Sequence, residues 1–171
     1  YPGALKAIAR YEWTEENELR LTLTAESDAP TVLNLTNHAY FNLNGEGNGN
    51  ILGHTLRLNC SEYLPTDATQ IPLGESAPVA GTPMDFVTQK PIGQDINADF
   101  EPLKIGKGYD HCWVIDGAEP GQLQDCAELY APESGRLLQI FTTQPGVQVY
   151  TGNWLTGSPA GKNGHDYQDY E

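Results

Sequence analysis

The sequence predicts an all-β protein, an antiparallel sandwich or barrel, and three observations carry this prediction. Short runs of residues alternate between apolar and polar side chains, which is the period-two pattern of a half-buried strand. Gly (18) and Pro (12) are frequent among the 171 residues and dispersed along the chain, as in a turn-rich protein. No window of a dozen residues keeps the spacing of an amphipathic helix. Many short strands at close spacing favour antiparallel sheets.

The clearest strand signal is the run LRLTLT at residues 19–24, in which leucine alternates with Arg or Thr. Asn17 before this run predicts a hairpin turn, and the break at residues 28–30 after it predicts a loop. The same reasoning predicts strands at residues 5–11, 31–35, 54–59, 137–142 and 147–150, and the continuous apolar run at residues 112–115 also predicts a strand.

Two segments do not fit a strand pattern. Residues 42–53, NLNGEGNGNILG, are so rich in Asn and Gly that they predict a mobile surface loop. Residues 90–108 contain three Gly, two Pro and scattered charges, and predict a long irregular excursion. Long loops in compact all-β domains are often functional. Since no internal repeat or linker interrupts the chain, the sequence predicts a single domain over residues 1–171.

The charge balance excludes several classes of partner. The formal net charge is −14 at pH 7, and a surface this acidic repels nucleic acid, anionic membranes and phosphorylated substrates. No stretch approaches the roughly 20 apolar residues of a membrane helix.

Cysteine usage and the first residues bear on the compartment. Three cysteines without a C-x-x-C pair indicate neither a disulfide framework nor a zinc site, and favour a reducing, cytoplasmic compartment. The opening residues YPGALK lack the regions of a signal peptide and an initiator Met. We therefore expect a processed, trimmed or partial chain.

The densest polar and aromatic cluster is NLTNHAYFNL at residues 34–43. If residues 31–35 form a strand, alternate polar side chains share one of its faces, and His38 lies at the end of that row, beside the glycine-rich loop. A neutral imidazole donates or accepts a proton near neutral pH, and the neighbours Asn37 and Tyr40 can hydrogen-bond to hydroxyl groups. The alternative is a hydrogen-bonded structural histidine.

A second cluster, GKGYDHCW at residues 106–113, places Asp110 at the entrance of an expected strand. A carboxylate there can accept two charge-assisted hydrogen bonds from sugar hydroxyls. Alternatively, Asp110 stabilises its own turn. A metal site with His111 is disfavoured, because adjacent strand residues point to opposite faces. Asp110 and Asp85 as a glycosidase pair stay open, since the sequence does not set their separation.

A third cluster, TTQPGVQVYTGN at residues 142–153, contains a Pro145-Gly146 signal for a type II turn. Gln148 and Tyr150 then share one face of the following strand. Uncharged polar groups beside aromatics suit a neutral sugar, which offers hydroxyls and a flat C–H face. The same side chains could instead pair across strands.

Together these clusters resemble the aldose 1-epimerase (galactose mutarotase) family along nearly the whole chain. The matching motifs are LNLTNHAYFNLNG (33–45), HTLRLNCSEYLPTD (54–67), GTPMDF (81–86), KGYDHCW (107–113), SGRLLQIFTTQPGVQVYTGNWL (134–155) and GKNGHDY (161–167). In this order and spacing the motifs are highly specific.

The resemblance implies a large antiparallel β-sandwich of the galactose mutarotase type, with a sugar-binding cleft. It also implies the interconversion of α and β anomers of hexoses such as galactose and glucose, without a cofactor or metal. By this resemblance His38 occupies the general-acid position and protonates the ring oxygen. Tyr40, Asp110 and Gln148 occupy positions that bind sugar hydroxyls, and Asn37 has a supporting role.

The chain departs from the family pattern at its ends. The family's general base is a Glu that follows the motif matched by Tyr167, and Glu171 falls short of that position. The resemblance also implies an N-terminal portion with a substrate-binding Arg and another His, which these residues do not match, so we expect an incomplete sandwich. We therefore expect this chain alone to have little activity, and its unpaired strand edges to favour self-association.

Two other functions are weighed against the epimerase. A non-catalytic sugar-binding module would keep the cleft and lose the chemistry. An epimerase of hexose 6-phosphates would need clustered Arg or Lys, whereas the chain has nine in all and none flanks His38 or Asp110.

Overall fold

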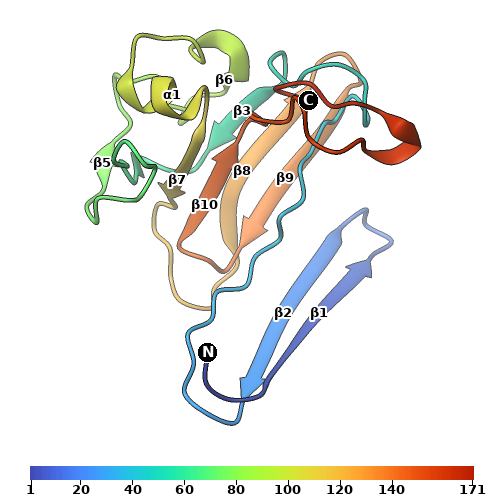
Figure 1. Ribbon diagram of the computed structural model, residues 1–171, viewed down its shortest axis with the longest axis vertical. Coiled ribbons are helices and arrows are strands. Elements are labelled where there is room, and N and C mark those ends of the chain that lie inside the picture. The colour runs from blue at the N-terminus through green and yellow to red at the C-terminus, as the bar shows by residue number, and fades with distance from the viewer. The chain divides into compact units, whose positions relative to one another are not determined.

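Strand pairing accounts for most of the regular structure in the computed structural model, which describes residues 1–171 apart from the Asn163 side chain. The chain divides into two units, Tyr1–Tyr40 and Phe41–Glu171. Figure 1 labels the elements of both. The single domain that the sequence predicts over residues 1–171 remains a prediction.

The first unit is built on a hairpin of two antiparallel strands, β1 (Leu5–Trp13) and β2 (Leu19–Ser27). Both predicted strands are confirmed, and each runs two or more residues beyond the predicted range. The predicted turn residue Asn17 has φ 60° and donates its N–H to Thr14 O at 3.3 Å. Asn tolerates this left-handed conformation, which explains the turn.

The predicted strand at residues 31–35 is wrong. Among the described residues, no strand lies between Ser27, the last residue of β2, and Thr55, the first residue of the next strand. A strand needs a partner backbone as well as an alternating sequence, and this segment has none among the described residues. His38 therefore does not end the polar stripe of a strand.

The second unit contains two four-stranded sheets, in the orders β10-β7-β4-β5 and β6-β3-β8-β9, and every strand pair is antiparallel. Figure 1 shows β8 and β9 running side by side. The strands are β3 (Thr55–Leu58), β4 (Glu62–Tyr63), β5 (Ala77–Pro78), β6 (Lys90–Pro91), β7 (Asp110–Val114), β8 (Gln124–Ala131), β9 (Arg136–Thr142) and β10 (Gly146–Tyr150). The predicted strands at β3, β7, β9 and β10 are confirmed, whereas β8 and the two-residue strands were not predicted.

A single hydrophobic core joins the two sheets. It receives Leu58 and Cys126 from one sheet and Trp113 and Tyr63 from the other, all nearly inaccessible to solvent. Apolar side chains from two sheets packing on one another define a β-sandwich. The antiparallel sandwich predicted from the sequence is therefore confirmed.

The predicted irregular excursion at residues 90–108 contains short regular elements. They are β6, the 3-10 helix η1 (Ile92–Gln94) and the α-helix α1 (Glu101–Gly106); a second 3-10 helix, η2 (Lys162–Gly164), lies near the C-terminus. Helix α1 has a proline in its first turn and is capped at its C-terminal end by Lys107, which is left-handed with φ 54°. A helix of six residues is too short to show a helical period over a dozen residues.

Candidate active site

The candidate site is built on the neighbouring strands β7 and β10. Along β7, His111 and Trp113 are buried while Asp110 and Cys112 are partly exposed, so the two pairs lie on opposite faces. The register places Gln148 opposite Cys112 and Tyr150 opposite Asp110. Asp110, Cys112, Gln148 and Tyr150 therefore share one face of the sheet, called the polar face here.

The structure brings together two of the predicted sugar-binding residues. Gln148 Nε2 donates a hydrogen bond to Asp110 Oδ1 at 2.8 Å. The two side chains are diagonal neighbours on adjacent antiparallel strands, a separation that long side chains bridge readily. Among the described residues the side-chain hydrogen bonds of this pair use only Oδ1 and Nε2, so Asp110 Oδ2 and Gln148 Oε1 remain as acceptors for hydroxyl groups.

Buried polar groups hold the chain that enters β7. Thr151 pairs with both polar groups of the Tyr109 backbone: its N–H donates to Tyr109 O, and its side-chain Oγ1 accepts from Tyr109 N, both at 3.1 Å. The buried Asn153 Nδ2 donates to Gly106 O at 2.8 Å and to Tyr109 O at 3.0 Å. These bonds join the start of β7 to the residues that follow β10. These buried bonds of Tyr109, Thr151 and Asn153, called the Asn153 frame here, therefore fix β7 and β10, which carry the polar face, relative to one another.

Burial of the neighbouring His111 makes it a structural histidine. Its Nδ1 accepts a hydrogen bond from Asp110 N at 3.1 Å, so the neutral ring carries its proton on Nε2. Burial lowers the pKa of His111, an effect that the nearby Asp110 carboxylate partly opposes. Because the two side chains lie on opposite faces, they do not form a metal-binding pair.

Gly146 lies in β10 opposite Val114, so the predicted type II turn at Pro145-Gly146 is wrong. That turn needs a positive φ at its glycine, and Gly146 has none. A Cβ at this position would lie 3.0 Å from Trp113 O and 3.1 Å from Cys112 Sγ. The glycine therefore permits close approach of β7 and β10 rather than a turn.

Asn37, His38 and Tyr40 lie close together in the first unit. The rings of His38 and Tyr40 are 5.4 Å apart at a tilt of 55°. Asn37 Oδ1 accepts a hydrogen bond from Ala39 N at 2.9 Å, which is an Asx turn within the motif. The NHAY segment is thus locally ordered although it is not a strand.

The glycine-rich loop at residues 42–53 is confirmed as a loop, and hydrogen bonds hold it both internally and to residues outside it. Asn42 Nδ2 donates to Gly49 O at 2.8 Å. Leu43 N donates to Nε2 of the buried His54 at 3.0 Å, and Leu43 O accepts from Arg136 Nη1 at 2.8 Å. Burial lowers the pKa of His54. The bond from Leu43 N requires Nε2 to be the unprotonated nitrogen of the neutral ring. The mobility of the loop stays a prediction.

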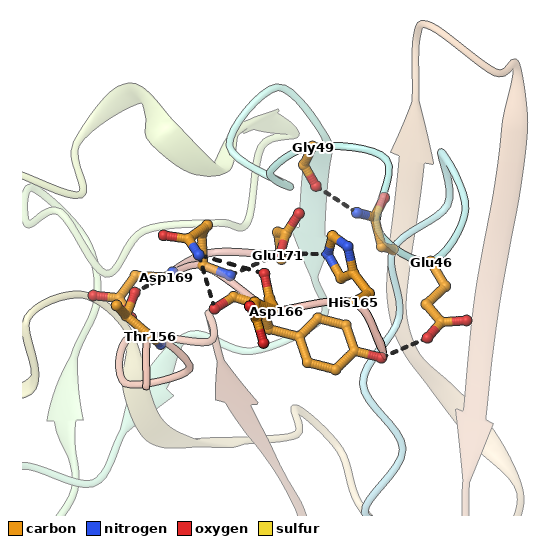
Figure 2. Close-up of polar contacts among 10 residues, drawn as sticks. Glu46, Gly49, Thr156, His165, Asp166, Asp169 and Glu171 are labelled. Carbon is orange, nitrogen blue, oxygen red and sulfur yellow. Dashed lines mark hydrogen bonds and ion pairs between the residues drawn. The ribbon is translucent and has the colours of Figure 1, made fainter. Parts of the chain in front are cut away.

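The chain end forms a polar cluster that the sequence analysis missed, although it lies in and after the quoted motif GKNGHDY. In Figure 2 His165 faces Glu171, and Glu46 reaches this segment from the glycine-rich loop. His165 Nε2 lies 3.1 Å from Glu171 Oε2, which also accepts from Gln168 N at 2.7 Å. Tyr167 Oη donates to Glu46 Oε1 at 2.6 Å. The hydrogen bond from the backbone N–H of Gln168 first, and then that from His165, lower the pKa of Glu171.

None of the helices in the described residues has the length and apolar character needed to cross a lipid bilayer. Within the same part of the chain, no three or more His, Cys, Asp and Glu side chains are grouped to hold a metal ion.

The chain is similar to known proteins of one family. The family model described as aldose 1-epimerase matches residues 1–171. The chain is 41% identical over 167 residues to the galactose mutarotase of Homo sapiens, which covers 98% of this chain and 46% of the relative. It is 36% identical over 171 residues to the aldose 1-epimerase of Escherichia coli (strain K12), covering 100% of this chain and 48% of the relative.

A solved structure agrees with these sequence matches. The galactose 1-epimerase of Lactobacillus acidophilus NCFM superposes with a TM-score of 0.84 at 34% identity, over 99% of this chain and 47% of that one. The chain thus spans about half the length of the relatives that it matches. With the family model matched from the first residue to the last, the chain belongs to the aldose 1-epimerase family.

Proposed function

We propose that the protein to which this chain belongs interconverts the α and β anomers of a neutral hexose such as galactose or glucose. The observation that carries the proposal is the hydrogen-bonded pair of Asp110 and Gln148 on the polar face. A carboxylate fixed beside an amide offers several acceptors and donors in one place, which is what recognition of neighbouring sugar hydroxyls needs. Relatives named galactose mutarotase and aldose 1-epimerase support the same activity.

The proposed substrate is uncharged. The formal net charge of −14 makes a phosphorylated sugar an unfavourable ligand. We assign Asp110, Gln148 and Tyr40 to the sugar hydroxyls, and Asn37 to the support of the NHAY segment. The Asx turn at Asn37 supports its assignment, because it orders the backbone beside His38.

The proposed chemistry is acid–base catalysis without a cofactor. A base removes the proton from the anomeric hydroxyl, and His38 as general acid protonates the ring oxygen. The bond between C1 and the ring oxygen breaks as C1 and the anomeric oxygen form a carbonyl. Rotation about C1–C2 and reversal of both proton transfers close the ring on the other face, with no net change in atoms or charge.

The base is not assigned to Glu171. Its carboxylate accepts the Gln168 N–H and pairs with His165 inside the C-terminal cluster. By the family resemblance the base is a Glu that follows the motif matched by Tyr167. Two groups are needed because the two proton transfers take place at different edges of the sugar ring.

We also place the protein in a reducing, cytoplasmic compartment. All three cysteines are free thiols, and Cys60 and Cys126 are buried. Free thiols persist where the surroundings are reducing, which supports this assignment.

Polarimetry on freshly dissolved α-D-galactose tests the function in the whole protein. We expect accelerated mutarotation, and a loss of about 10²-fold or more in kcat on His38→Asn. His165→Asn is the matched control, because this imidazole pairs with Glu171 rather than with the polar face. Equal rates for His38→Asn and the unmodified protein would contradict the acid assignment.

Titration calorimetry with galactose separates the enzyme from a binding module. Galactose binding together with accelerated mutarotation supports the epimerase. Binding without acceleration would identify a non-catalytic carbohydrate-binding protein instead. The absence of both would contradict the proposed function.

A further inference from the structure

Tyr170 connects three segments of the second unit through its backbone and its side chain. Its N–H donates to Gly152 O, and its C=O accepts from Ile51 N, both at 2.8 Å. Its φ of 70° is left-handed, a conformation that is uncommon for a bulky residue and is held here by both backbone bonds. Tyr170 therefore joins the end of the glycine-rich loop to the residues just after β10.

The side chain of Tyr170 adds the third connection. Its hydroxyl donates to Lys107 O at 2.7 Å, while its ring packs against the hydrophobic core. Lys107 ends helix α1 and begins the short connection to Asp110, the first residue of β7. The Lys107 ammonium lies 3.8 Å from the centroid of the Trp154 ring, a second contact between this connection and the residues after β10.

These contacts bear on the Asp110–Gln148 pair because Asp110 closely follows one residue bound by Tyr170 and Gln148 closely precedes the other. Asp110 lies three residues after Lys107, and Gln148 lies four residues before Gly152. A hydrogen bond between diagonal side chains depends on the register and separation of β7 and β10. The residue that bridges Lys107 and Gly152 consequently constrains both ends of this pair.

We propose that Tyr170 is a positioning residue for the sugar-binding pair, holding Asp110 at the start of β7 through the hydrogen bond from its hydroxyl to Lys107 O. This inference rests on the proposed function. Tyr170 does not lie on the polar face, so its effect on the sugar passes through Asp110 and Gln148.

Tyr170→Phe isolates the hydroxyl, because it keeps the ring and both backbone bonds. Tyr167→Phe is the matched control: it also removes one phenol hydrogen bond from the C-terminal segment, but that bond goes to Glu46. In the whole protein we expect Tyr170→Phe to raise the KM for galactose about two- to tenfold, with kcat changed less than twofold. We expect Tyr167→Phe to leave KM unchanged. An equal KM for both variants would overturn the inference.

Two further measurements keep the inference testable apart from the activity. Hydrogen exchange in the peptide that spans residues 107–112 is expected to be faster in Tyr170→Phe than in Tyr167→Phe. Equal protection would show that the Tyr170 hydroxyl does not hold this segment and would overturn the inference. Gly152→Ala perturbs the connection through Tyr170 from the β10 side, because its Cβ would lie 3.0 Å from Leu155 Cδ1 and 3.5 Å from Glu171 O. We expect it to raise KM as well, and an unchanged KM would contradict the inference.

The two proposals fail in different ways. An unmodified protein without mutarotation or galactose binding contradicts the proposed function, whatever the variants do. An active unmodified protein whose KM and exchange are insensitive to Tyr170→Phe contradicts the inference alone.

Discussion

Gln148 donates a 2.8 Å hydrogen bond to Asp110 across the β7–β10 pair, from a strand position opposite Cys112 rather than opposite Asp110 itself. This diagonal geometry leaves Asp110 Oδ2 and Gln148 Oε1 available to accept hydrogen bonds from a ligand. The bond also orients the carboxylate before a ligand arrives, which reduces the entropy lost on binding.

A double-mutant cycle measures the contribution of this pair to sugar binding. In the whole protein, we expect Asp110→Ala and Gln148→Ala each to weaken galactose binding about tenfold or more, because each removes hydrogen bonds to the sugar, those of Asp110 being charge-assisted. The double variant should lose less than the sum of the two, with a coupling of about 1 kcal/mol. Titration calorimetry gives the affinities.

The sheet formed by β8 and β9 supplies a matched control for that cycle. Gln139 Nε2 donates to Glu128 Oε2 at 3.2 Å, also between neighbouring antiparallel strands. Alanine at Glu128 and Gln139 should leave galactose affinity unchanged. Weakened binding in this control comparable to that at Asp110 and Gln148 would show that the cycle reports fold stability instead.

The three thiols are expected to be unreactive in the folded chain. Burial raises the pKa of Cys60 to about 12 and that of Cys126 to about 11, and it also raises the pKa of Cys112. Since the thiolate is the reactive form, DTNB at pH 8 should label the native chain slowly, with Cys112 first because it is the least buried. In guanidinium all three should react at once. Rapid labelling of Cys60 in the native chain would show that its site is open.

The stability of the fold should decrease as the pH falls below neutrality. Burial lowers the pKa of His54 and of His111, so the unfolded chain binds more protons than the folded chain near the ordinary histidine value of 6.5. Their contribution is complete above 6.5 and is lost as the pH falls towards the folded-state pKa values. The limiting slope is about 1.4 kcal/mol per pH unit for each histidine.

Urea unfolding at several pH values between about 7.5 and 5.5 checks this expectation, because carboxylates titrate mostly below that range. His54→Gln keeps an acceptor for Leu43 N and removes one titrating group. Its free energy of unfolding should vary less steeply with pH. A slope identical to that of the unmodified chain would exclude His54 as a source of the pH dependence.

Gly108→Ala should be far more destabilising than Gly121→Ala. Both glycines have positive φ, at 142° and 76°, so alanine is strained at either position. At Gly108 the new Cβ would also lie 2.5 Å from Asn153 Oδ1 and 2.9 Å from Thr151 Oγ1, whereas nothing lies within 4 Å of it at Gly121. We expect the free energy of unfolding, measured by urea titration, to fall by about 3 kcal/mol or more in Gly108→Ala and by about 1 kcal/mol in Gly121→Ala. Equal losses would show that the side chains of the Asn153 frame move aside at little cost in free energy.

The sequence by itself determined the antiparallel class, the β1–β2 hairpin with its turn at Asn17, and the strands β3, β7, β9 and β10. These features are local, because alternation and turn chemistry are encoded within a few consecutive residues. The order and spacing of its motifs likewise indicated the family that the comparisons confirm.

Strand β8 escaped prediction because its alternation is broken. A register shift between Asp125 and Ala127 buries the consecutive residues Cys126 and Ala127, so the period-two pattern fails there. The expected strand at residues 31–35 failed for the opposite reason: its pattern is present, but no described strand pairs with it. Alternation of apolar and polar residues shows that a segment is compatible with a strand. The segment becomes a strand only where a neighbouring backbone pairs with it.

Only the tertiary structure decided that Gln148 meets Asp110, that Tyr170 bridges Lys107 and Gly152, and that Glu46 meets Tyr167. Each contact joins residues between 18 and 121 positions apart in the chain, as counted from their numbers. The register of paired strands and the path of the chain end follow from the packing of the whole core. No short stretch of the sequence determines that packing.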